Sequence, residues 1–282
     1  MIFLFILTGT ANARTDFERM EQLAAAEYGQ NAAATIKAWR AMIEKNRTQP
    51  NFSKLDRVNA FVNDRIAYAS DREVWGVDDY WTTPLELFGK GRGDCEDYAI
   101  AKYISLLLMD VPVQKLRLVY VRANMGSRTV AHMVLSYFEN PTDDPLILDN
   151  LTDTILPAKR RSDLFPVFSF NHEGLWVGGE QSSGTDPSAR LSRWRDVLQR
   201  MRREGIDPSL TQLNARSTTS WEKSKPRLSS PNMAKSRLPS KVTAKNQVGT
   251  ATKKTASNKM KSTKLKAKTA KYSPPSRKIA KR

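Results

Sequence analysis

The sequence has few residues of the kinds that cross-link a chain or span a membrane. It contains a single cysteine, Cys95, which excludes an intramolecular disulfide. A lone cysteine in a cytosolic protein is usually a small buried hydrophobic residue, whereas an oxidising compartment disfavours idle thiols. No apolar run approaches the ~20 residues that a membrane span needs. We therefore expect a mature protein that does not span a membrane, and the compartment decides how Cys95 is interpreted.

The body of the chain also lacks a strong net charge, although the whole sequence carries +17. Residues 217–282 hold 19 of the 46 basic residues and one acid, Glu222, so the basicity belongs to this segment. Lys, Ser, Thr, Pro and Ala dominate there, which predicts a disordered basic tail. The overall charge therefore predicts no specific nucleic-acid partner for the globular part. The tail could bind acidic envelope polymers or nucleic acid by screened electrostatics, or it could be inert, and the residues leave these alternatives open.

The first residues carry a pattern typical of a signal peptide. Ile2 to Leu7 is a run of apolar residues, and Ala11-Asn12-Ala13 follows as an A-x-A cleavage site. The charged segment that normally precedes such a run is missing, and a buried first strand or helix is the alternative interpretation. The order of the two features favours export, with a signal-peptide-like segment at 1–13 and a globular domain at 14–216.

The hydrophobic pattern of the globular domain predicts helices first and strands later, which is an α+β arrangement. Apolar residues recur at helical spacing over residues 15–70, and the segment 71–94, rich in Trp, Asp, Pro and Gly, reads as a long loop. The remaining expected elements are a helix over 95–109, strands at 116–122, 132–138 and 146–148, a further strand near 165–170 or 175–177, and a helix over 191–203. Asn140-Pro141 marks a turn, so the strands at 132–138 and 146–148 are expected to pair.

Cys95 lies where the helix over 95–109 should begin. The dipole and free N–H groups of a helix N-terminus favour a thiolate, while Asp94, Glu96 and Asp97 would raise the pKa of the thiol by repulsion. Clustered carboxylates suit Ca²⁺, and the same acids also suit a helix N-terminus. On composition and spacing alone, helix capping is the simpler interpretation.

Two histidines are present, His132 and His172. His132 begins one expected strand and Asp149 ends its expected partner, so Asp149 could hold the imidazole as the third member of a triad. His172 reads as a loop residue. One cysteine and two histidines by themselves remain a weak signal of catalysis.

A family resemblance adds to this interpretation. The blocks Asp79-Tyr80-Trp81-Thr82-Thr83-Pro84-Leu85-Glu86, Gly91-Arg92-Gly93-Asp94-Cys95-Glu96-Asp97-Tyr98, Ala131-His132-Met133-Val134-Leu135 and Leu148-Asp149-Asn150 resemble the bacterial transglutaminase-like cysteine proteinases, whose best-known members are the LapG-type periplasmic proteases. The similarity runs over roughly residues 30–200. It implies a papain/transglutaminase-like α+β fold, in which a helical N-terminal lobe and the helix that bears the nucleophile pack on a small antiparallel sheet.

The resemblance also implies a chemistry and a setting. It implies a Cys95–His132–Asp149 triad and dependence on Ca²⁺, with Asp94 and Glu96 as metal ligands, which reverses the preference for capping. It implies a periplasmic endopeptidase that cuts a large surface adhesin near its N-terminus and so promotes biofilm dispersal. An inner-membrane receptor for cyclic di-GMP would sequester the protease. The basic tail is a departure from the family that the resemblance does not explain.

The expected mechanism is nucleophilic. The Cys95 thiolate attacks the scissile carbonyl, and His132 protonates the leaving amine and then activates water. The Cys95 backbone N–H would hold the oxyanion together with a second donor that the sequence does not identify. Two alternatives remain: a transglutaminase-type acyltransferase that uses the same triad, and a non-enzymatic envelope-binding protein that acts through its basic tail.

Overall fold

The computed structural model describes residues 15–177, 180–181 and 186–208. The signal-peptide-like segment at 1–13 and the basic tail at 217–282 lie outside the described residues. The helices are α1 (Phe17–Tyr28), α2 (Gln30–Asn46), α3 (Asn51–Arg65), α4 (Asp71–Val74), α5 (Pro84–Lys90), α6 (Cys95–Leu108), α7 (Pro187–Arg190) and α8 (Ser192–Glu204). The strands are β1 (Ala67–Tyr68), β2 (Arg92–Gly93), β3 (Leu116–Met125), β4 (Arg128–Tyr137), β5 (Leu146–Leu148), β6 (Leu156–Pro157), β7 (Leu164–Phe170), β8 (Leu175–Val177) and β9 (Glu180–Gln181).

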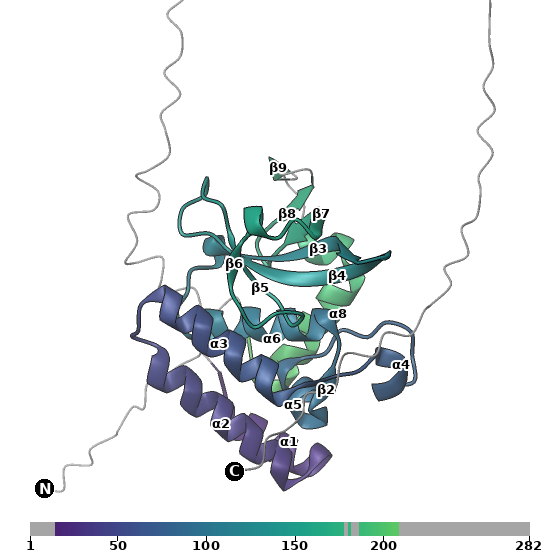
Figure 1. Ribbon diagram of the computed structural model, residues 1–282. Coiled ribbons are helices and arrows are strands. Elements are labelled where there is room, and N and C mark those ends of the chain that lie inside the picture. Colours follow the sequence, from purple (N-terminus) through teal and green to yellow (C-terminus); the bar gives the residue numbers. More distant parts are fainter. Residues whose placement is uncertain (1–14, 178–179, 182–185, 209–282) are drawn as a thin grey trace, which may run out of the picture. The chain divides into compact units, whose positions relative to one another are not determined.

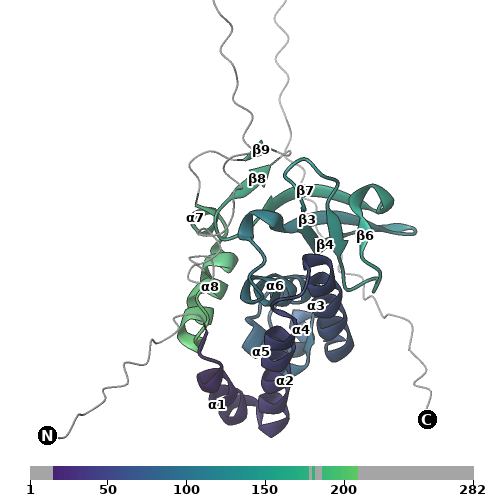
Figure 2. The same cartoon turned by 90° about the vertical axis from the view of Figure 1, so that its left-hand side faces the viewer.

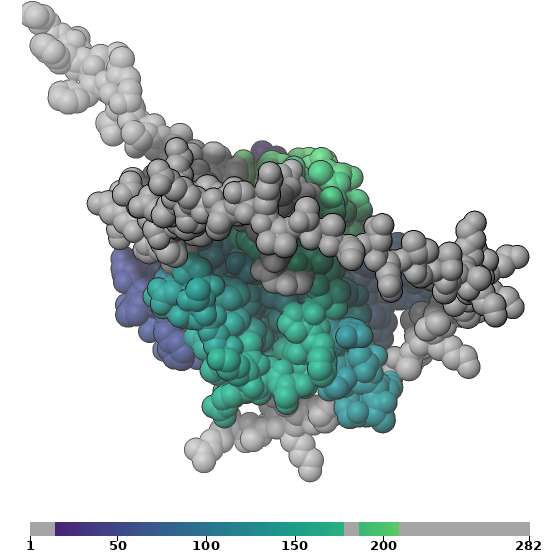
Figure 3. Space-filling view, turned by 90° about the horizontal axis from the view of Figure 1, so that it is seen from above, coloured from purple at the N-terminus to yellow at the C-terminus, as the bar shows by residue number. Residues whose placement is uncertain are grey.

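The helices gather on one side of a seven-stranded sheet. The sheet has the order β6-β5-β4-β3-β7-β8-β9 and is antiparallel throughout. Figures 1 and 2 show α3, α5 and α6 beneath the sheet, with α1 and α2 farther from it and α8 beside them. Figure 3, seen from above, looks onto the teal and green residues of the strands and their connections. The expected α+β class is confirmed.

Helix α6 is the centre of the core. Its side chains are buried from Asp97 to Leu108, because α3 and α5 pack against it on one side and β3 and β4 on the other. The apolar members, such as Ile104 and Leu107, each contribute roughly 1.5–3 kcal/mol on full burial. A polar tie joins this helix to α2, since the Trp39 Nε1–H donates to Ser105 Oγ at 2.8 Å. Packing on both sides and this tie therefore hold the body of α6 in a fixed position.

The strand pairing that bears on the site is the one between β4 and β5. Leu135 pairs with Leu148 and Tyr137 with Leu146, as the turn at Asn140-Pro141 predicts. His132 lies inside β4 rather than at its start, because β4 extends back to Arg128 along β3. Asp149 follows directly after β5. The hairpin thus brings the histidine strand and the Asp149 segment together.

The expectation of a long loop over 71–94 is wrong. That segment contains the helices α4 and α5 and the short strand β2, which pairs in parallel with β1. Both helices begin at capping boxes, Ser70 with Glu73 and Thr83 with Glu86, and Pro84 occupies the first turn of α5. These are S/T-x-x-E signals that satisfy the first N–H groups of a helix. The local sequence therefore did carry the helix starts.

The ends of the described body lie side by side. Thr15 and Ile206 form an antiparallel bridge, and the Asp16 N–H donates to the Gly205 carbonyl at 2.9 Å. Among the described helices, none combines the length and the apolar character that a membrane crossing requires.

Candidate active site

Cys95 is the first residue of α6, as the sequence predicts. The turn into it follows Gly91, whose φ of 64° lies in the left-handed region that favours glycine. At the first position of a helix the backbone N–H has no intrahelical partner, so it remains available to a ligand. The cysteine itself is half-buried. The fold thus presents its sulfur and a free N–H at the same point.

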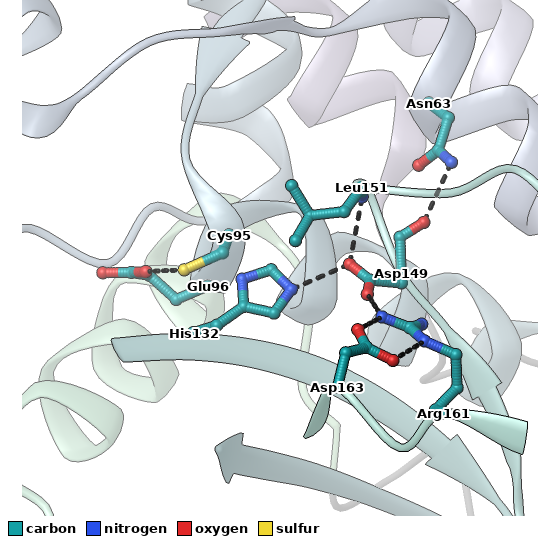
Figure 4. A network of polar contacts seen from close by, with 8 residues as sticks. All are labelled: Asn63, Cys95, Glu96, His132, Asp149, Leu151, Arg161 and Asp163. Atoms are coloured by element: carbon teal, nitrogen blue, oxygen red, sulfur yellow. Dashed lines mark hydrogen bonds and ion pairs between the residues drawn. The ribbon is translucent and has the colours of Figure 1, made fainter. Parts of the chain in front are cut away.

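The imidazole of His132 lies between the sulfur and a carboxylate. His132 Nε2 is 2.8 Å from Asp149 Oδ1, and the other ring nitrogen, Nδ1, is on the side of Cys95 in Figure 4. The His132 side chain is 4% exposed and that of Asp149 is fully buried. Three elements, α6, β4 and the end of β5, therefore bring the residues together in the order thiol, imidazole, carboxylate.

The Asp149 carboxylate is held from several directions. Burial opposes its ionisation, but hydrogen bonds from His132, the Leu151 backbone N–H and Arg161 outweigh burial and keep the pKa of Asp149 below its ordinary value. The Asn63 side chain on α3 donates to the Asp149 backbone carbonyl at 3.0 Å. Asp149 is therefore an anion in a fixed orientation (Figure 4).

The surroundings of the Cys95 thiol oppose its ionisation. Burial raises the pKa of the Cys95 thiol well above its ordinary value, and the charges of Glu96 and Asp94 raise it further. The Cys95 S–H donates to Glu96 Oε2 at 2.9 Å, while a hydrogen bond from the Met133 backbone opposes the rise. The repulsion that the sequence predicts from Asp94 and Glu96 is therefore present, and burial of the sulfur adds to it.

A cluster of carboxylates surrounds the start of α6. Ligand atoms of Asp94, Cys95 and Glu96 lie within 4.8 Å of one another, as do those of Asp71, Asp94 and Asp97, and those of Asp71, Asp79 and Glu96. Asp94 and Glu96 were predicted as ligands, and the structure adds Asp71 and Asp79 from the preceding segment. Such a set of oxygen donors is what Ca²⁺ prefers.

The electrostatics of this cluster favour a cation. Burial, followed by repulsion from Glu96, raises the pKa of Asp94 to about 10. Burial also raises the pKa of Asp97 to about 8 and that of Asp71 to about 6. Asp71 Oδ1 and Asp94 Oδ1 are buried and have no hydrogen-bond partner among the described residues. A bound cation would satisfy both oxygens and offset the mutual repulsion, so the residues fit a calcium ion.

Two other residues considered from the sequence, His172 and Trp81, make packing or hydrogen-bond contacts with the core. His172 lies in a loop, and its Nδ1 is 2.6 Å from the Tyr103 hydroxyl. Trp81 stacks on Phe170, with ring centroids 5.8 Å apart. Sequence reasoning missed Arg161, whose guanidinium contacts Asp149, because its signal is only a Lys-Arg-Arg run that reads as surface charge.

Comparisons with known proteins agree with this arrangement. A family model described as bacterial transglutaminase-like cysteine proteinase BTLCP matches residues 21–181. Legionella pneumophila LapG is 37% identical; the match covers 67% of this chain and 98% of that chain, with a TM-score of 0.58. Its calcium-bound form matches at 37% identity over 66% of this chain and 99% of that one, with a TM-score of 0.57.

An EGTA-treated form of the same Legionella protein matches as the first does. A search of curated proteins gives no match. The family model covers more than half of the chain, and the likeness to LapG extends over almost all of that protein. The order of the motifs, the fold and these similarities lead to one conclusion: the chain belongs to the bacterial transglutaminase-like cysteine proteinases.

Proposed function

We propose that the protein is a calcium-dependent periplasmic cysteine endopeptidase that cuts a large cell-surface adhesin near its N-terminus, releasing it and promoting biofilm dispersal. Cys95 is the nucleophile, His132 the base and Asp149 the residue that orients the base. One observation supports these roles best: His132 Nε2 is 2.8 Å from the buried Asp149 carboxylate, and the opposite ring nitrogen faces Cys95.

The roles follow from the geometry. Asp149 accepts the Nε2–H of His132, so the lone pair on Nδ1 is directed toward the sulfur. Nδ1 takes the thiol proton as the sulfur attacks the scissile carbonyl, and the tetrahedral oxyanion lies near the free N–H of Cys95. His132 then returns the proton to the leaving amine, and the C–N bond breaks. Water, deprotonated by His132, hydrolyses the thioester and restores the thiol.

The open end of β4 supports an extended peptide as substrate. Strand β5 pairs with β4 over Leu135–Tyr137, while Arg128–Ala131, at the other end of β4 and next to His132, are exposed. An extended chain can add to a strand edge through backbone hydrogen bonds. A small-residue linker of the Ala-Ala type, as the family resemblance implies, would lie along such an edge without steric conflict.

Calcium would bind at the carboxylates around the start of α6. Asp94 and Glu96 are the proposed ligands, with Asp71 and Asp79 completing the set, because their oxygens approach one another and two of them lack partners. The bound ion would supply positive charge among these acids. Calcium-bound and EGTA-treated forms of Legionella pneumophila LapG support this part of the proposal. Sequestration by an inner-membrane cyclic-di-GMP receptor belongs to the same proposal.

The test has two steps: a search of the neighbouring genes for a giant secreted repeat protein with an Ala-Ala segment near its start, and a cleavage assay on the N-terminal region of that protein. We expect wild-type protein to cut it with Ca²⁺ and not with excess EGTA. Cys95→Ala should abolish cleavage without changing the circular dichroism spectrum. His132→Asn should do the same, and His172→Asn is the matched control, since it removes the chain's other histidine. Full cleavage by Cys95→Ala would refute the proposal.

The same assay separates the alternatives. Crosslinked product in the presence of a primary amine and a Gln-containing acceptor would favour the transglutaminase-type acyltransferase. A chain lacking residues 217–282 addresses the binding alternative. If this truncation removes the biological effect while Cys95→Ala leaves it intact, the protein acts through its basic tail and the enzymatic proposal fails.

A further inference from the structure

The Asp149 carboxylate has a second strong partner on the side away from His132. Asp149 Oδ1 forms the hydrogen bond with His132 Nε2, while Asp149 Oδ2 accepts a hydrogen bond from Arg161 Nη2 at 2.8 Å. Both side chains are buried, with 7% of Arg161 and none of Asp149 exposed. Figure 4 shows the guanidinium and the imidazole on different sides of the carboxylate. The contact is therefore an interior ion pair adjoining the proposed base.

Arg161 is itself held independently of His132. Its Nε donates to Asp163 Oδ1 at 3.0 Å and its Nη2 to Asp163 Oδ2 at 2.7 Å, in the two-point geometry that carboxylates form with guanidinium groups. The Asp163 carbonyl accepts the Asn124 N–H, near the end of β3, at 2.8 Å. The guanidinium is thus anchored to the central strands of the sheet through Asp163, independently of its contact with Asp149.

A buried carboxylate is stabilised best by a group that stays positively charged, and less well by one whose protonation state changes during the reaction. Burying an unpaired carboxylate is strongly unfavourable, and the group takes up a proton instead. His132 is neutral during part of the proposed cycle, so it cannot balance Asp149 throughout. Lys102 lies near, but burial lowers its pKa to about 7. Arg161 stays protonated at every relevant pH. It is therefore the constant counter-charge of Asp149.

An ionised Asp149 also selects the tautomer of His132. A carboxylate accepts hydrogen bonds only, so it holds the proton on Nε2 and leaves Nδ1 free to take the thiol proton. A protonated Asp149 could donate to Nε2 instead, which would place the imidazole proton on Nδ1, toward the sulfur. The identity of the group behind Asp149 thus decides which nitrogen faces Cys95 as a base.

We propose that Arg161 is a positioning residue of this protease: it keeps Asp149 ionised and oriented, and through Asp149 it fixes the working tautomer of His132. This inference rests on the proposed function. Arg161 touches neither the sulfur nor the imidazole, so its effect passes through Asp149. Partners behind the residues that ligate a metal typically contribute 10–100-fold, and we expect an effect of similar size for a partner behind a base.

The test uses the full chain in Ca²⁺ and the reaction of its single cysteine with iodoacetamide at neutral pH. We expect Arg161→Met to slow alkylation of Cys95 by roughly 10–100-fold, and Arg161→Lys to recover part of the loss because it keeps a cation. Arg160→Met, an exposed neighbour, is the matched control and should react as wild type does. Asp163→Asn should give a smaller loss of the same kind.

A second readout distinguishes positioning from simple structural support. Because the chain has two histidines, imidazole ¹⁵N shifts report each ring. We expect one Nε2–H tautomer for His132 in the wild type, a mixture in Arg161→Met, and no change at His172. In an Asp149→Asn background, Arg161→Met should cause little further slowing of alkylation.

Three results would overturn the inference: wild-type reactivity and an unchanged tautomer in a folded Arg161→Met protein, an equal slowing by Arg161→Met in the Asp149→Asn background, or a matching effect of Arg160→Met. If Arg161→Met does not fold, Arg161→Lys and Asp163→Asn decide, since wild-type tautomer and reactivity in both would overturn it. Wild-type alkylation in His132→Asn would instead refute the proposed roles of Cys95 and His132, and so marks failure of the proposed function.

Discussion

Lys102 should destabilise the protein at neutral pH. Its side chain is fully buried on α6, and its ammonium nitrogen has no hydrogen-bond partner among the described residues. The Tyr98 ring, 5.8 Å away, and the charges of Asp149 and Asp153 offer partial compensation. Methionine has a similar volume and no charge, so Lys102→Met should raise the free energy of unfolding near pH 7.

The size of the effect follows from the pKa of the amine. Burial lowers the pKa of Lys102 from 10.5 to about 7. Each unit corresponds to about 1.4 kcal/mol, so the full penalty is on the order of 5 kcal/mol. The folded state binds fewer protons than the unfolded state between these two pH values, so stability rises with pH across that window. The penalty is complete below pH 7 and disappears above pH 10.5.

The assay compares urea unfolding of wild type and Lys102→Met near pH 7 and at about pH 10, at constant Ca²⁺. We expect the variant to be more stable near pH 7 and the gap to shrink by several kcal/mol at the higher pH. Lys54→Met is the control: the Lys54 amine donates to the Met109 carbonyl at 2.9 Å, so its loss should lower stability by about 1 kcal/mol. The prediction fails if Lys102→Met has a lower free energy of unfolding than wild type near pH 7, or if the difference between the two proteins is the same at both pH values. Either result would show that the amine is protonated and well paired inside the protein.

Three further outcomes are expected at other buried positions of the fold. Asp71→Asn should raise the melting temperature in EGTA, because burial raises the pKa of Asp71 to about 6 and so makes its charge unfavourable at neutral pH. The same substitution should reduce the increase in melting temperature that Ca²⁺ causes, and an unchanged increase would contradict this. Gly93→Ala should lower stability by roughly 1–3 kcal/mol in calorimetry, since its Cβ would lie 2.5 Å from Asp97 Oδ2 and 2.7 Å from Leu87 Cδ1. Glu204→Gln should stabilise the protein increasingly as pH rises from 4.5 to about 8, because burial raises the pKa of Glu204 to about 8 and its ionisation weakens the fold; a pH-independent difference in urea unfolding would refute it.

The arrangement of Cys95, His132 and Asp149 was readable because each of them follows a local signal. A glycine-rich turn and a polar residue precede Cys95 at a helix start, and a single turn joins the two strands next to His132 and Asp149. Pairing of Leu135 with Leu148 then places the aspartate beside the histidine. Local patterns and one hairpin register were sufficient for these positions.

Other parts of the site depend on packing that no local pattern records. Arg161 reaches Asp149 across a connection that includes β6, and Asp71 reaches Asp94 only because the segment before α6 folds back onto its first turn. The sequence predicts repulsion between the Cys95 thiolate and its neighbouring acids, but it does not predict the burial that adds to the rise in the pKa of the thiol, since burial is a property of the assembled core. The helices α4 and α5 are a different case, because the sequence does contain a local signal for them, the capping boxes at Ser70 and Thr83.

The position of Asp149 needs more support than its own strand provides. β5 is three residues long, and so short a strand frays readily unless it is tied down. Asn63 ties the Asp149 backbone to α3, and Arg161 ties its carboxylate to Asp163, which β3 holds through Asn124. The same strand β3 pairs with β4 and places Val121 opposite His132. The imidazole and the Arg161–Asp163 pair that holds its carboxylate therefore share one reference strand, which keeps their separation fixed although β4 and β7 lie on opposite sides of β3 in the sheet.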